Sequence, residues 1–421
     1  MSKTHLSATK IKCMKDCPMI VFLKHVCGIL KHVETDARRI GSNWHKVLEV
    51  ASIPPGSVCP LCAVKSANDG NCPLCSGTGF LPDDALATVT NQLNADYGER
   101  PTGVEAEDWE LERIKLLYSY VAYRWVYEQE EYETVARELD FNMSVLSPKS
   151  GRSIPNTELV GKIDKLIKLG PHRHSVMEHK STSSSVAADS TYWGHLRLDT
   201  QSLLYLYIAR RMLKEGLLEP YGLFYGKDQI TGVYYDVYHK PGINPKKLTQ
   251  AESKQFVEDG KYCNGEFTVT IVEDEESTPG CITAHPENLT DEESNEEAPI
   301  LGIGVNDAYA TFELGKKPGT FAIKETAEMY GARLLQDMTE RPDFYFARKE
   351  ITFSDEVVEK FEKEIFNLHT TMRLMKNNNS WYCNESHCEA TYKCDYIDIC
   401  YNGLNVETDP LPAGLYKKEK K

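Results

Sequence analysis

No apolar run in this chain of 421 residues reaches the roughly 20 residues that a helix needs to cross a bilayer. The N-terminal stretch MSKTHLSATKIKCMKDCP lacks the apolar segment of a secretory signal, and no segment of the chain repeats. With 41% hydrophobic and 26% charged residues, the composition also lacks the bias of collagen, coiled coils or wholly disordered chains. We therefore expect a cytoplasmic globular protein without a membrane partner, built as one large domain with insertions or as two domains.

Lysine and arginine are absent between residues 272 and 299, where ten aspartates and glutamates gather. Subtracting these ten charges from the net charge of −15 leaves only −5 for the rest of the chain. A segment of this composition buries little apolar surface, so we expect a solvated, mobile loop. The nearly balanced remainder neither favours nor excludes a nucleic-acid partner.

The thirteen cysteines indicate metal ligands rather than cross-links, because thiols stay reduced in the cytosol. Cys59, Cys62, Cys72 and Cys75 form two C-x2-C knuckles, which is the ligand pattern of one tetrahedral zinc ion. The stretch CPLCSGTGF also resembles half of the zinc module of DnaJ-type chaperones. A site of four cysteines has no open position, so we expect structural zinc in a small insertion over residues 54–82.

Hydrophobic periodicity predicts the order of helices and strands. Helical spacing covers residues 6–34, with an interruption at Pro18, and residues 38–51, 105–130, 196–216 and 355–375. Strand-like segments cover residues 132–146, 157–169, 174–182 and 344–354, and we expect the second and third of these to pair through the turn GPHRH. Residues 221–241 read as a hairpin that turns between Asp228 and Gly232.

One strand carries Asp164, and the next carries Glu178, His179 and Lys180 at the end of an apolar run. Adjacent strands would bring Asp164 and Glu178 together as oxygen ligands for Mg2+ or Mn2+, with the backbone carbonyl of His179 as a third. Lys180 lies on the same strand face as Glu178 and could orient an attacking water, whereas the His179 ring should point to the other face. The plainer interpretation is an edge strand whose polar residues face water. The apolar neighbours instead favour a cleft at one end of a sheet.

In this order, GSNWHKVLE, GKIDKL, EHK and QSLLY resemble the motifs of the PD-(D/E)XK nucleases, and within them the RecB-like branch. This branch includes the AddB nuclease domain and the CRISPR-associated RecB-type exonucleases. The resemblance implies a catalytic and metal-binding set of His45, Asp164, Glu178, Lys180, Gln201 and Tyr205. Taken singly, His45 could be an ordinary helix histidine, and Gln201 and Tyr205 are one helical turn apart. Glu138 is either an extra carboxylate or a surface residue.

The same resemblance implies a [4Fe-4S] cluster, in which one cysteine before the nuclease core joins three cysteines after it. By position these are Cys17, Cys388, Cys394 and Cys400. Cys13 is the alternative to Cys17, and Cys383 is the alternative to Cys388. A zinc ion on Cys383, Cys388, Cys394 and Cys400 is the main competing interpretation, although their spacing lacks a C-x2-C knuckle. The cluster would hold the two ends of the chain together.

The expected fold is α/β: a restriction-endonuclease-like PD-(D/E)XK core whose mixed central sheet is flanked by helices, with a zinc insertion and a C-terminal iron-sulfur segment. The expected function is that of a Mg2+- or Mn2+-dependent deoxyribonuclease, an exonuclease acting on DNA ends or single strands. We expect the nuclease to act in recombination, repair or mobile-element DNA processing, with recombination or replication proteins as partners. The alternative is a non-cleaving nucleic-acid-binding or assembly factor. The predicted ranges are N-terminal helices 1–53, zinc insertion 54–82, nuclease core 83–225, hairpin and acidic-loop insertion 226–350, and C-terminal helix and iron-sulfur segment 351–421.

Overall fold

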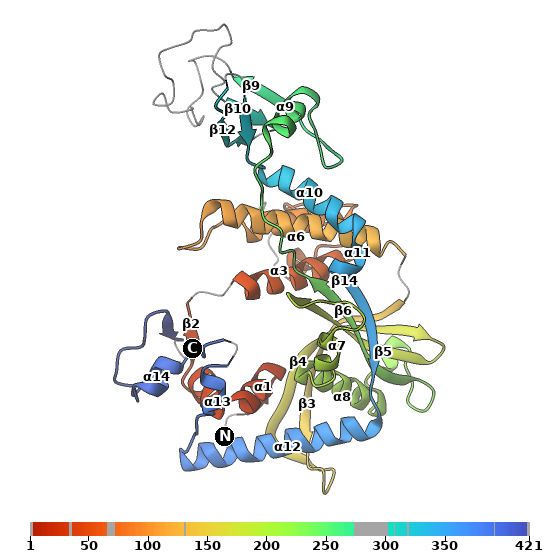
Figure 1. Cartoon of the computed structure of the whole chain (residues 1–421). Coiled ribbons are helices and arrows are strands. Elements are labelled where there is room, and N and C mark those ends of the chain that lie inside the picture. Colours follow the sequence, from red (N-terminus) through yellow and green to blue (C-terminus); the bar gives the residue numbers. More distant parts are fainter. Residues whose placement is uncertain are drawn as a thin grey trace.

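The fold is α/β, with one mixed sheet between two layers of helices, as the sequence predicts (Figure 1). This computed structural model describes residues 3–32, 36–64, 72–129, 132–272, 302–306, 308–317, 320–390 and 392–418. Across these ranges, no helix combines the length and the apolar character that crossing a membrane requires.

Six strands form the central sheet in the order β1-β4-β5-β6-β14, and β3 pairs with the opposite edge of β4. The β1–β4 and β5–β6 pairs are parallel, and the other neighbours are antiparallel. The predicted pairing through the GPHRH turn is confirmed. The strands are β1 (Thr4–Leu6), β3 (Glu133–Leu146), β4 (Ser153–Gly170), β5 (Arg173–Thr182), β6 (Gln229–His239) and β14 (Phe346–Thr352).

Strand β4 changes its neighbour along one edge, and this change opens the sheet. Residues 157–159 pair with β1, whereas residues 165–170 pair with β5. Asp164 lies at the fork between these two pairings. Because Lys165 is paired with Met177, the register places Asp164 opposite Glu178. The sheet therefore brings the two predicted acids together where its strands separate.

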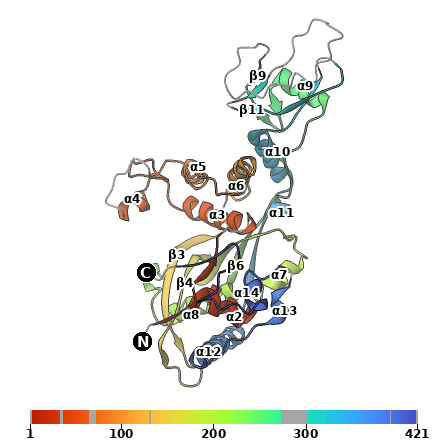
Figure 2. The same ribbon diagram turned by 90° about the vertical axis from the view of Figure 1, so that its left-hand side faces the viewer.

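Helices cover both faces of the sheet (Figures 1 and 2). One layer consists of α1 (Ala8–Asp16), α8 (Thr200–Lys214) and α12 (Asp355–Asn378). The other layer is built from α3 (Asp36–Ala51), α5 (Ala85–Asp96), α6 (Ala106–Val126) and α10 (Ala327–Glu340). Shorter helical segments are α2 (Pro18–Ile20), η1 (Val21–Val26), α4 (Pro60–Val64), α7 (Thr191–Leu196), η2 (Glu219–Tyr221), α11 (Pro342–Tyr345), α13 (Glu385–Cys388) and α14 (Ile397–Tyr401).

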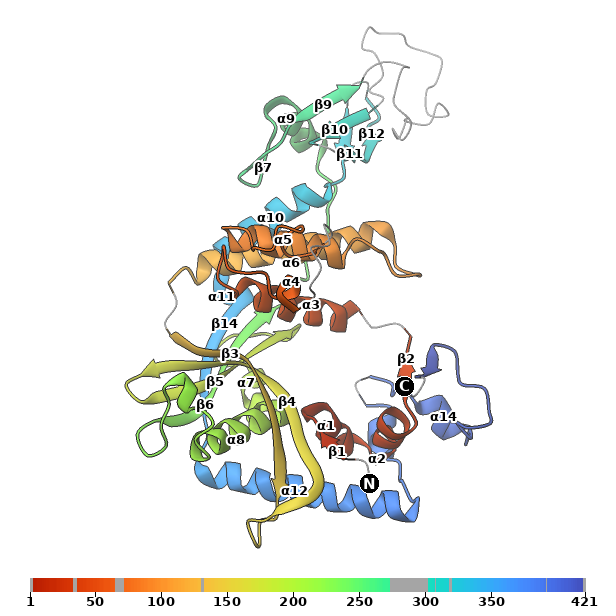
Figure 3. The same cartoon turned by 180° about the vertical axis from the view of Figure 1, so that it is seen from behind.

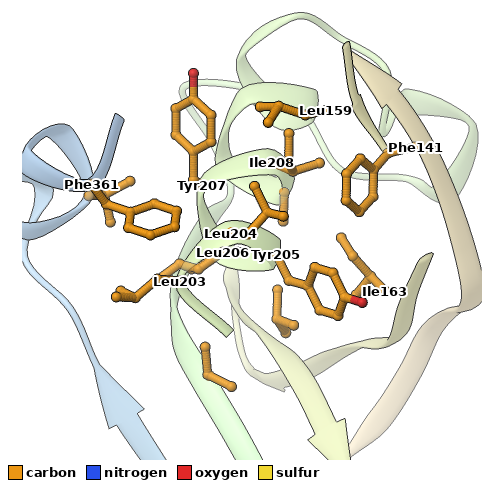
Figure 4. Close-up of a cluster of buried hydrophobic side chains, with 14 of the residues drawn as sticks. Phe141, Leu159, Ile163, Leu203, Leu204, Tyr205, Leu206, Tyr207, Ile208 and Phe361 are labelled. Carbon is orange, nitrogen blue, oxygen red and sulfur yellow. The ribbon is translucent and has the colours of Figure 1, made fainter. Parts of the chain in front are cut away.

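Helix α8 is buried around most of its circumference, because it lies between the sheet and α12. Figure 4 shows its leucines packed among side chains of β3, β4 and α12, including Phe141, Ile163 and Phe361. Ile163 directly precedes Asp164, so the core fixes the backbone that carries the first predicted acid.

Replacing Leu204 by alanine should lower the free energy of unfolding by about 2–5 kcal/mol, the usual cost of a large-to-small change in a packed core. Leu204 is fully buried in this cluster. Urea denaturation of wild type and Leu204→Ala measures the difference. The exposed Leu374 on α12 provides the control, since Leu374→Ala removes the same atoms from a solvated position. Equal losses in both variants would contradict the assignment of this core.

The predicted hairpin over residues 221–241 is wrong. The tight turn lies earlier, where the Asp228 carboxylate accepts the N–H of Phe224 at 2.9 Å, and residues 229–239 form one continuous strand. Gly232 is not a turn residue. A Cβ at this position would lie 2.3 Å from the carbonyl oxygen of Ile351, so the glycine allows close approach of β14. Strands β6 and β14 belong to the central sheet, although β6 and most of β14 lie within the range predicted as an insertion.

Between these two strands, the chain builds a small separate layer above α10 (Figure 1). Its core contains Leu248, Phe256, Ile303 and Ile323. The predicted acidic loop starts at Val272, the end of β9, and its residues 273–299 lie outside the described residues. The elements are α9 (Gln250–Asp259), β7 (Lys261–Tyr262), β8 (Gly265–Glu266), β9 (Val269–Val272), β10 (Gly302–Val305), β11 (Ala308–Ala310), β12 (Phe312–Leu314) and β13 (Phe321–Ile323).

The C-terminal segment returns to the N-terminal segment (Figure 3). Strand β15 (Leu415–Lys417) pairs with β2 (Ile29–Lys31), and the Tyr396 hydroxyl donates to the carbonyl of Ile29 at 3.0 Å. The side-chain amide of Asn384 donates to the carbonyl of Asp16 at 2.8 Å. The N-terminal and C-terminal segments are thus joined beside the central sheet.

Candidate active site and cysteine centres

Glu178 is the most buried acid of the predicted set, with no exposed surface. Its Oε1 accepts the Lys180 ammonium at 2.9 Å, whereas its Oε2 has no hydrogen-bond partner among the described residues. Burial raises the pKa of Glu178 to about 8, and the Asp164 charge adds to this rise. A buried carboxylate oxygen without a donor is costly, so this atom points to a cation as its partner.

Lys180 occupies the same face of β5 as Glu178 and is surrounded by acceptors. Its Nζ lies 2.9 Å from Glu178 Oε1, 3.3 Å from Gln201 Oε1 and 3.6 Å from Asp199 Oδ1. Burial lowers the pKa of Lys180, but the carboxylates of Glu178 and Asp199 outweigh it and leave the pKa raised. Lys180 is therefore an ammonium at neutral pH and acts as a donor and a positive charge, not as a proton acceptor.

Asp164 and His45 meet across the fork from different elements. The Asp164 Oδ2 atom accepts the backbone N–H of His179 at 3.2 Å and lies 3.8 Å from Nδ1 of His45 on α3. Helix α3 comes this close because Gly41 lies against β5, where a Cβ would be 2.9 Å from Ser181 Oγ. Burial lowers the pKa of His45 to about 4, which leaves a neutral imidazole, the form that binds metal.

The His179 ring lies on the opposite face of β5, as strand alternation predicts. Its Nδ1 is 2.9 Å from Asp236 Oδ2 on β6, and Asp236 also contacts Arg348 on β14 and accepts the Tyr123 hydroxyl of α6. Burial would raise the pKa of Asp236, but the His179 hydrogen bond and the Arg348 charge reverse this effect and lower it. The ionised Asp236 thereby fixes the His179 ring, and with it β5, on the face of the sheet opposite Glu178.

Gln201 and Tyr205 lie one turn apart on α8 and face the same site. The Gln201 Nε2 donates to the Tyr205 hydroxyl at 3.3 Å, while its Oε1 accepts from Lys180. Figure 4 shows Tyr205 directed toward β3 and β4, next to Phe141 and Ile163. Burial raises the pKa of Tyr205, so its hydroxyl keeps its proton. The pair forms one wall of the site beside the lysine.

Sequence reasoning missed two parts of this arrangement. Asp199 is the N-cap of α8, where its carboxylate accepts the Ser202 N–H at 2.8 Å, and it also balances Lys180. The pattern Asp-Thr-Gln-Ser just before an apolar helix was the available signal. Asp236 is an isolated acid within a buried strand, and the hairpin prediction concealed it. Glu138 forms an ion pair with Lys162 and is partly exposed, which corresponds to the surface alternative.

The structure brings Cys59, Cys62, Cys72 and Cys75 together. Their sulfur atoms all lie within 4.8 Å of one another, with Cys59–Cys72 at 3.6 Å and Cys62–Cys75 at 3.5 Å. Burial raises the pKa of Cys75, but the Gly79 N–H and the Cys62 thiol outweigh it and lower the pKa to about 6. Gly79 has φ +79°, which turns its N–H toward this sulfur. The four thiols form a group that can hold one metal ion.

A second group of cysteines gathers where the two ends of the chain meet. Cys17, Cys383, Cys388, Cys394 and Cys400 all line one small apolar hollow, together with Leu23, Tyr396 and Ile397. The Asn384 N–H donates to Cys17 Sγ at 3.2 Å, whereas Cys13 does not line the hollow and packs against the core beside α8. Cys388 is buried and Cys383 is exposed. This geometry favours Cys17 over Cys13, whereas Cys383 and Cys388 both line the hollow and differ only in burial.

Among the described residues, the four knuckle cysteines lie close enough together to hold one metal ion, and the donor atoms of the other groups have the matching chemistry. Asp164 and Glu178 offer the hard oxygen atoms that Mg2+ and Mn2+ prefer, and the Glu178 Oε2 atom lacks a donor among the described residues. Thiolates suit zinc and iron-sulfur clusters. A search of curated proteins finds no significant relative. The family model of the PD-(D/E)XK nuclease superfamily matches residues 5–401, and this chain therefore belongs to that superfamily.

Proposed function

We propose that the chain is a Mg2+- or Mn2+-dependent deoxyribonuclease, and that it acts as an exonuclease. Membership of the superfamily indicates a metal-dependent nuclease with DNA as its substrate. The observation that carries the proposal is the buried, partnerless Glu178 Oε2 opposite Asp164, at the point where β4 and β5 separate. A carboxylate pair with an adjacent ammonium provides the charges that phosphodiester hydrolysis requires.

In this proposal, Asp164, Glu178, the carbonyl of His179 and the neutral imidazole of His45 would hold the metal ion. When bound, the ion supplies an activated water and stabilises negative charge on the phosphate. The Lys180 ammonium orients the attacking water by donating hydrogen bonds to it. Gln201 holds Lys180 in position through its Oε1 atom, and the Tyr205 hydroxyl donates to a phosphate oxygen of the substrate.

Metal affinity should rise about tenfold per pH unit between about pH 6 and pH 8, and then level off. Without a bound cation, the raised pKa of about 8 leaves Glu178 protonated at neutral pH. Metal binding must therefore displace a proton below this pKa, and none above it. Titration calorimetry with Mn2+ across this range measures the effect. In Glu178→Gln, which has no proton to displace, the slope should become shallower. A wild-type affinity that is independent of pH would refute the link.

We further propose zinc at Cys59, Cys62, Cys72 and Cys75, with a structural role. Cys59 and Cys75 pack in the same hydrophobic cluster as Trp44 and Val47 of α3, the helix that carries His45. A closed metal site here would stabilise the position of that helix. The second group, Cys17, Cys388, Cys394 and Cys400, would hold a [4Fe-4S] cluster that links the two chain ends.

Cys72→Ser should lower the zinc content by one ion per chain, because a tetrahedral site rarely survives the loss of one thiolate. Elemental analysis of the purified variant measures the change. Cys263→Ser is the matched control, since Cys263 is half-buried in the separate small layer and lies near neither cysteine group. Unchanged zinc content in Cys72→Ser would contradict the assignment of zinc to these four cysteines.

The biological setting we propose is recombination, repair or mobile-element DNA processing, in which recombination or replication proteins are the expected partners. The first test is incubation of the purified chain with end-labelled single- and double-stranded DNA and Mn2+. Shortened, metal-dependent products support the nuclease. A shift in mobility without any shortening supports the alternative, a non-cleaving binding factor. Labels on the 5′ and 3′ ends in separate reactions give the polarity.

A further inference from the structure

A hollow of about 600 Å3 lies between the ends of α3 and α6 and the paired strands β3 and β4. Its volume falls in the range of ordinary ligand sites. Figure 3 shows α6 ending above the start of β3, on the side of the sheet opposite α8. The hydrophobic part of its wall, Leu48 and Leu86, is continuous with the cluster that packs against the knuckle cysteines. The rest of the lining is mainly aromatic and basic.

The aromatic side chains come from the last turns of α6. Trp125 is 57% exposed and its indole N–H has no hydrogen-bond partner among the described residues, which is unusual for the largest apolar side chain. Tyr120, Tyr123 and Tyr127 line the same hollow. An indole face that is open to solvent beside a hollow is suited to stacking on a flat ring, such as an unpaired base.

The basic side chains come mainly from the two strands. Arg137 and Lys165 are direct partners in the β3–β4 register, so both side chains leave the same face of the sheet. Arg137 is exposed and makes no ion pair with any residue that the structure describes. Arg124 is paired with Asp84 at 2.9 Å, but both are exposed, so water and salt weaken this pair. Against these three cations, the lining contains one carboxylate, Glu128.

The hollow borders the candidate active site through two shared neighbours. Lys165 follows Asp164 on β4, and the Tyr123 hydroxyl that lines the hollow also donates to Asp236, the partner of the His179 ring. One wall of the hollow therefore lies one residue from Asp164 along β4, on the face of the sheet that carries the His179 ring.

We propose that this hollow binds single-stranded DNA next to the scissile phosphate. A base stacks on Trp125, and Arg137 and Lys165 contact the adjacent phosphates. The inference deepens the proposed nuclease function and rests on it. Single strands are favoured over duplex because the faces of paired bases are covered by their neighbours, whereas an unpaired base can lie flat on the indole. The phosphate contacts carry no sequence information, so binding should be tolerant of sequence.

The test measures binding separately from cleavage. Fluorescence anisotropy of a fluorescein-labelled oligothymidylate is followed in EDTA, so that no strand is cut. Trp125→Ala should weaken binding about 5- to 150-fold, and Trp125→Phe should restore part of the loss because it keeps an aromatic face. Arg137→Gln should weaken binding and make the slope of affinity against salt concentration shallower by about 0.7, the value for one phosphate contact on a single strand. Tyr309→Ala and Lys254→Ala, two exposed residues of the small layer, should bind as wild type.

Wild-type affinity and salt slope in both Trp125→Ala and Arg137→Gln would overturn the proposal, as would an equal loss for blunt duplex DNA in Trp125→Ala. Circular dichroism and melting curves confirm that the variants are folded, which is expected for exposed residues. The outcomes also separate this proposal from the nuclease itself. If the chain cuts with Mn2+ but binds DNA equally well without Trp125, only the proposed binding of DNA in the hollow is rejected. If the chain binds DNA through Trp125 but never cuts it, only the proposed nuclease activity is rejected.

Discussion

Lys180→Ala should reduce the rate of DNA cleavage about 10²- to 10⁴-fold while leaving the fold intact. The variant loses the only ammonium that contacts Glu178 in the part of the chain that the structure describes. No other cation is then in place to orient water beside the carboxylates. Single-turnover cleavage of end-labelled DNA at saturating Mn2+ isolates the chemical step from binding and product release.

Lys162→Ala is the matched control, because Lys162 is a surface lysine on β4 that forms ion pairs with Glu49 and Glu138. It should cut at close to the wild-type rate. DNA binding by Lys180→Ala in EDTA should also equal that of wild type, since the raised pKa and burial of Lys180 reflect contacts within the protein. A cleavage rate of Lys180→Ala within about tenfold of the wild-type rate would contradict the proposed role of Lys180 in catalysis.

Cys394→Ser should abolish both the iron content and the brown colour of the anaerobically purified chain, because a [4Fe-4S] cluster requires four thiolates. Loss of the cluster should also loosen the joined chain ends, so limited proteolysis should remove the segment that follows α12. The remaining ties there are the short β2–β15 pair, hydrogen bonds such as Asn384 to Asp16, and a small hydrophobic cluster around Ile29 and Tyr396. Iron analysis, visible absorption and a proteolysis time course measure the three effects.

Variants of the neighbouring cysteines test which thiolates bind the cluster. Cys388→Ser should behave as Cys394→Ser, whereas Cys383→Ser should keep its iron, because Cys388 is buried and Cys383 is exposed. Cys13→Ser should likewise keep its iron, since Cys13 does not line the hollow. A colourless wild-type preparation that contains two zinc ions per chain would replace the cluster with a second zinc site.

Local sequence patterns were sufficient for the parts of the site that lie close together in the chain. The apolar alternation around Asp164 and Glu178, joined by a short turn, predicts two paired strands and hence two adjacent carboxylates. The C-x2-C knuckles predict a group of four cysteines by spacing alone, and the structure places those sulfur atoms together. In each case, the residues that matter are neighbours through one turn or one strand pair.

Long-range packing explains what the sequence did not reveal. The sequence pattern marks Gly232 as a turn residue, because β14, the strand that lies against it, comes more than a hundred residues later. Asp236 has its partners on three other elements, β5, α6 and β14, so no local pattern marks it. The fork at Asp164 arises because β5 pairs with only one half of β4. The other half of the same β4 edge pairs with β1, which comes from the N-terminal segment of the chain.

The most direct measurement of the central claim is a cleavage time course of one end-labelled single strand by wild type and Asp164→Asn in the same buffer. Asp164 is only half-buried and its replacement is nearly isosteric, so the fold should be kept. We predict that wild type shortens the strand only when Mg2+ or Mn2+ is present, and that Asp164→Asn leaves it intact. Shortening by Asp164→Asn at the wild-type rate, or by wild type in EDTA, would contradict the assignment of a metal-dependent nuclease to this site.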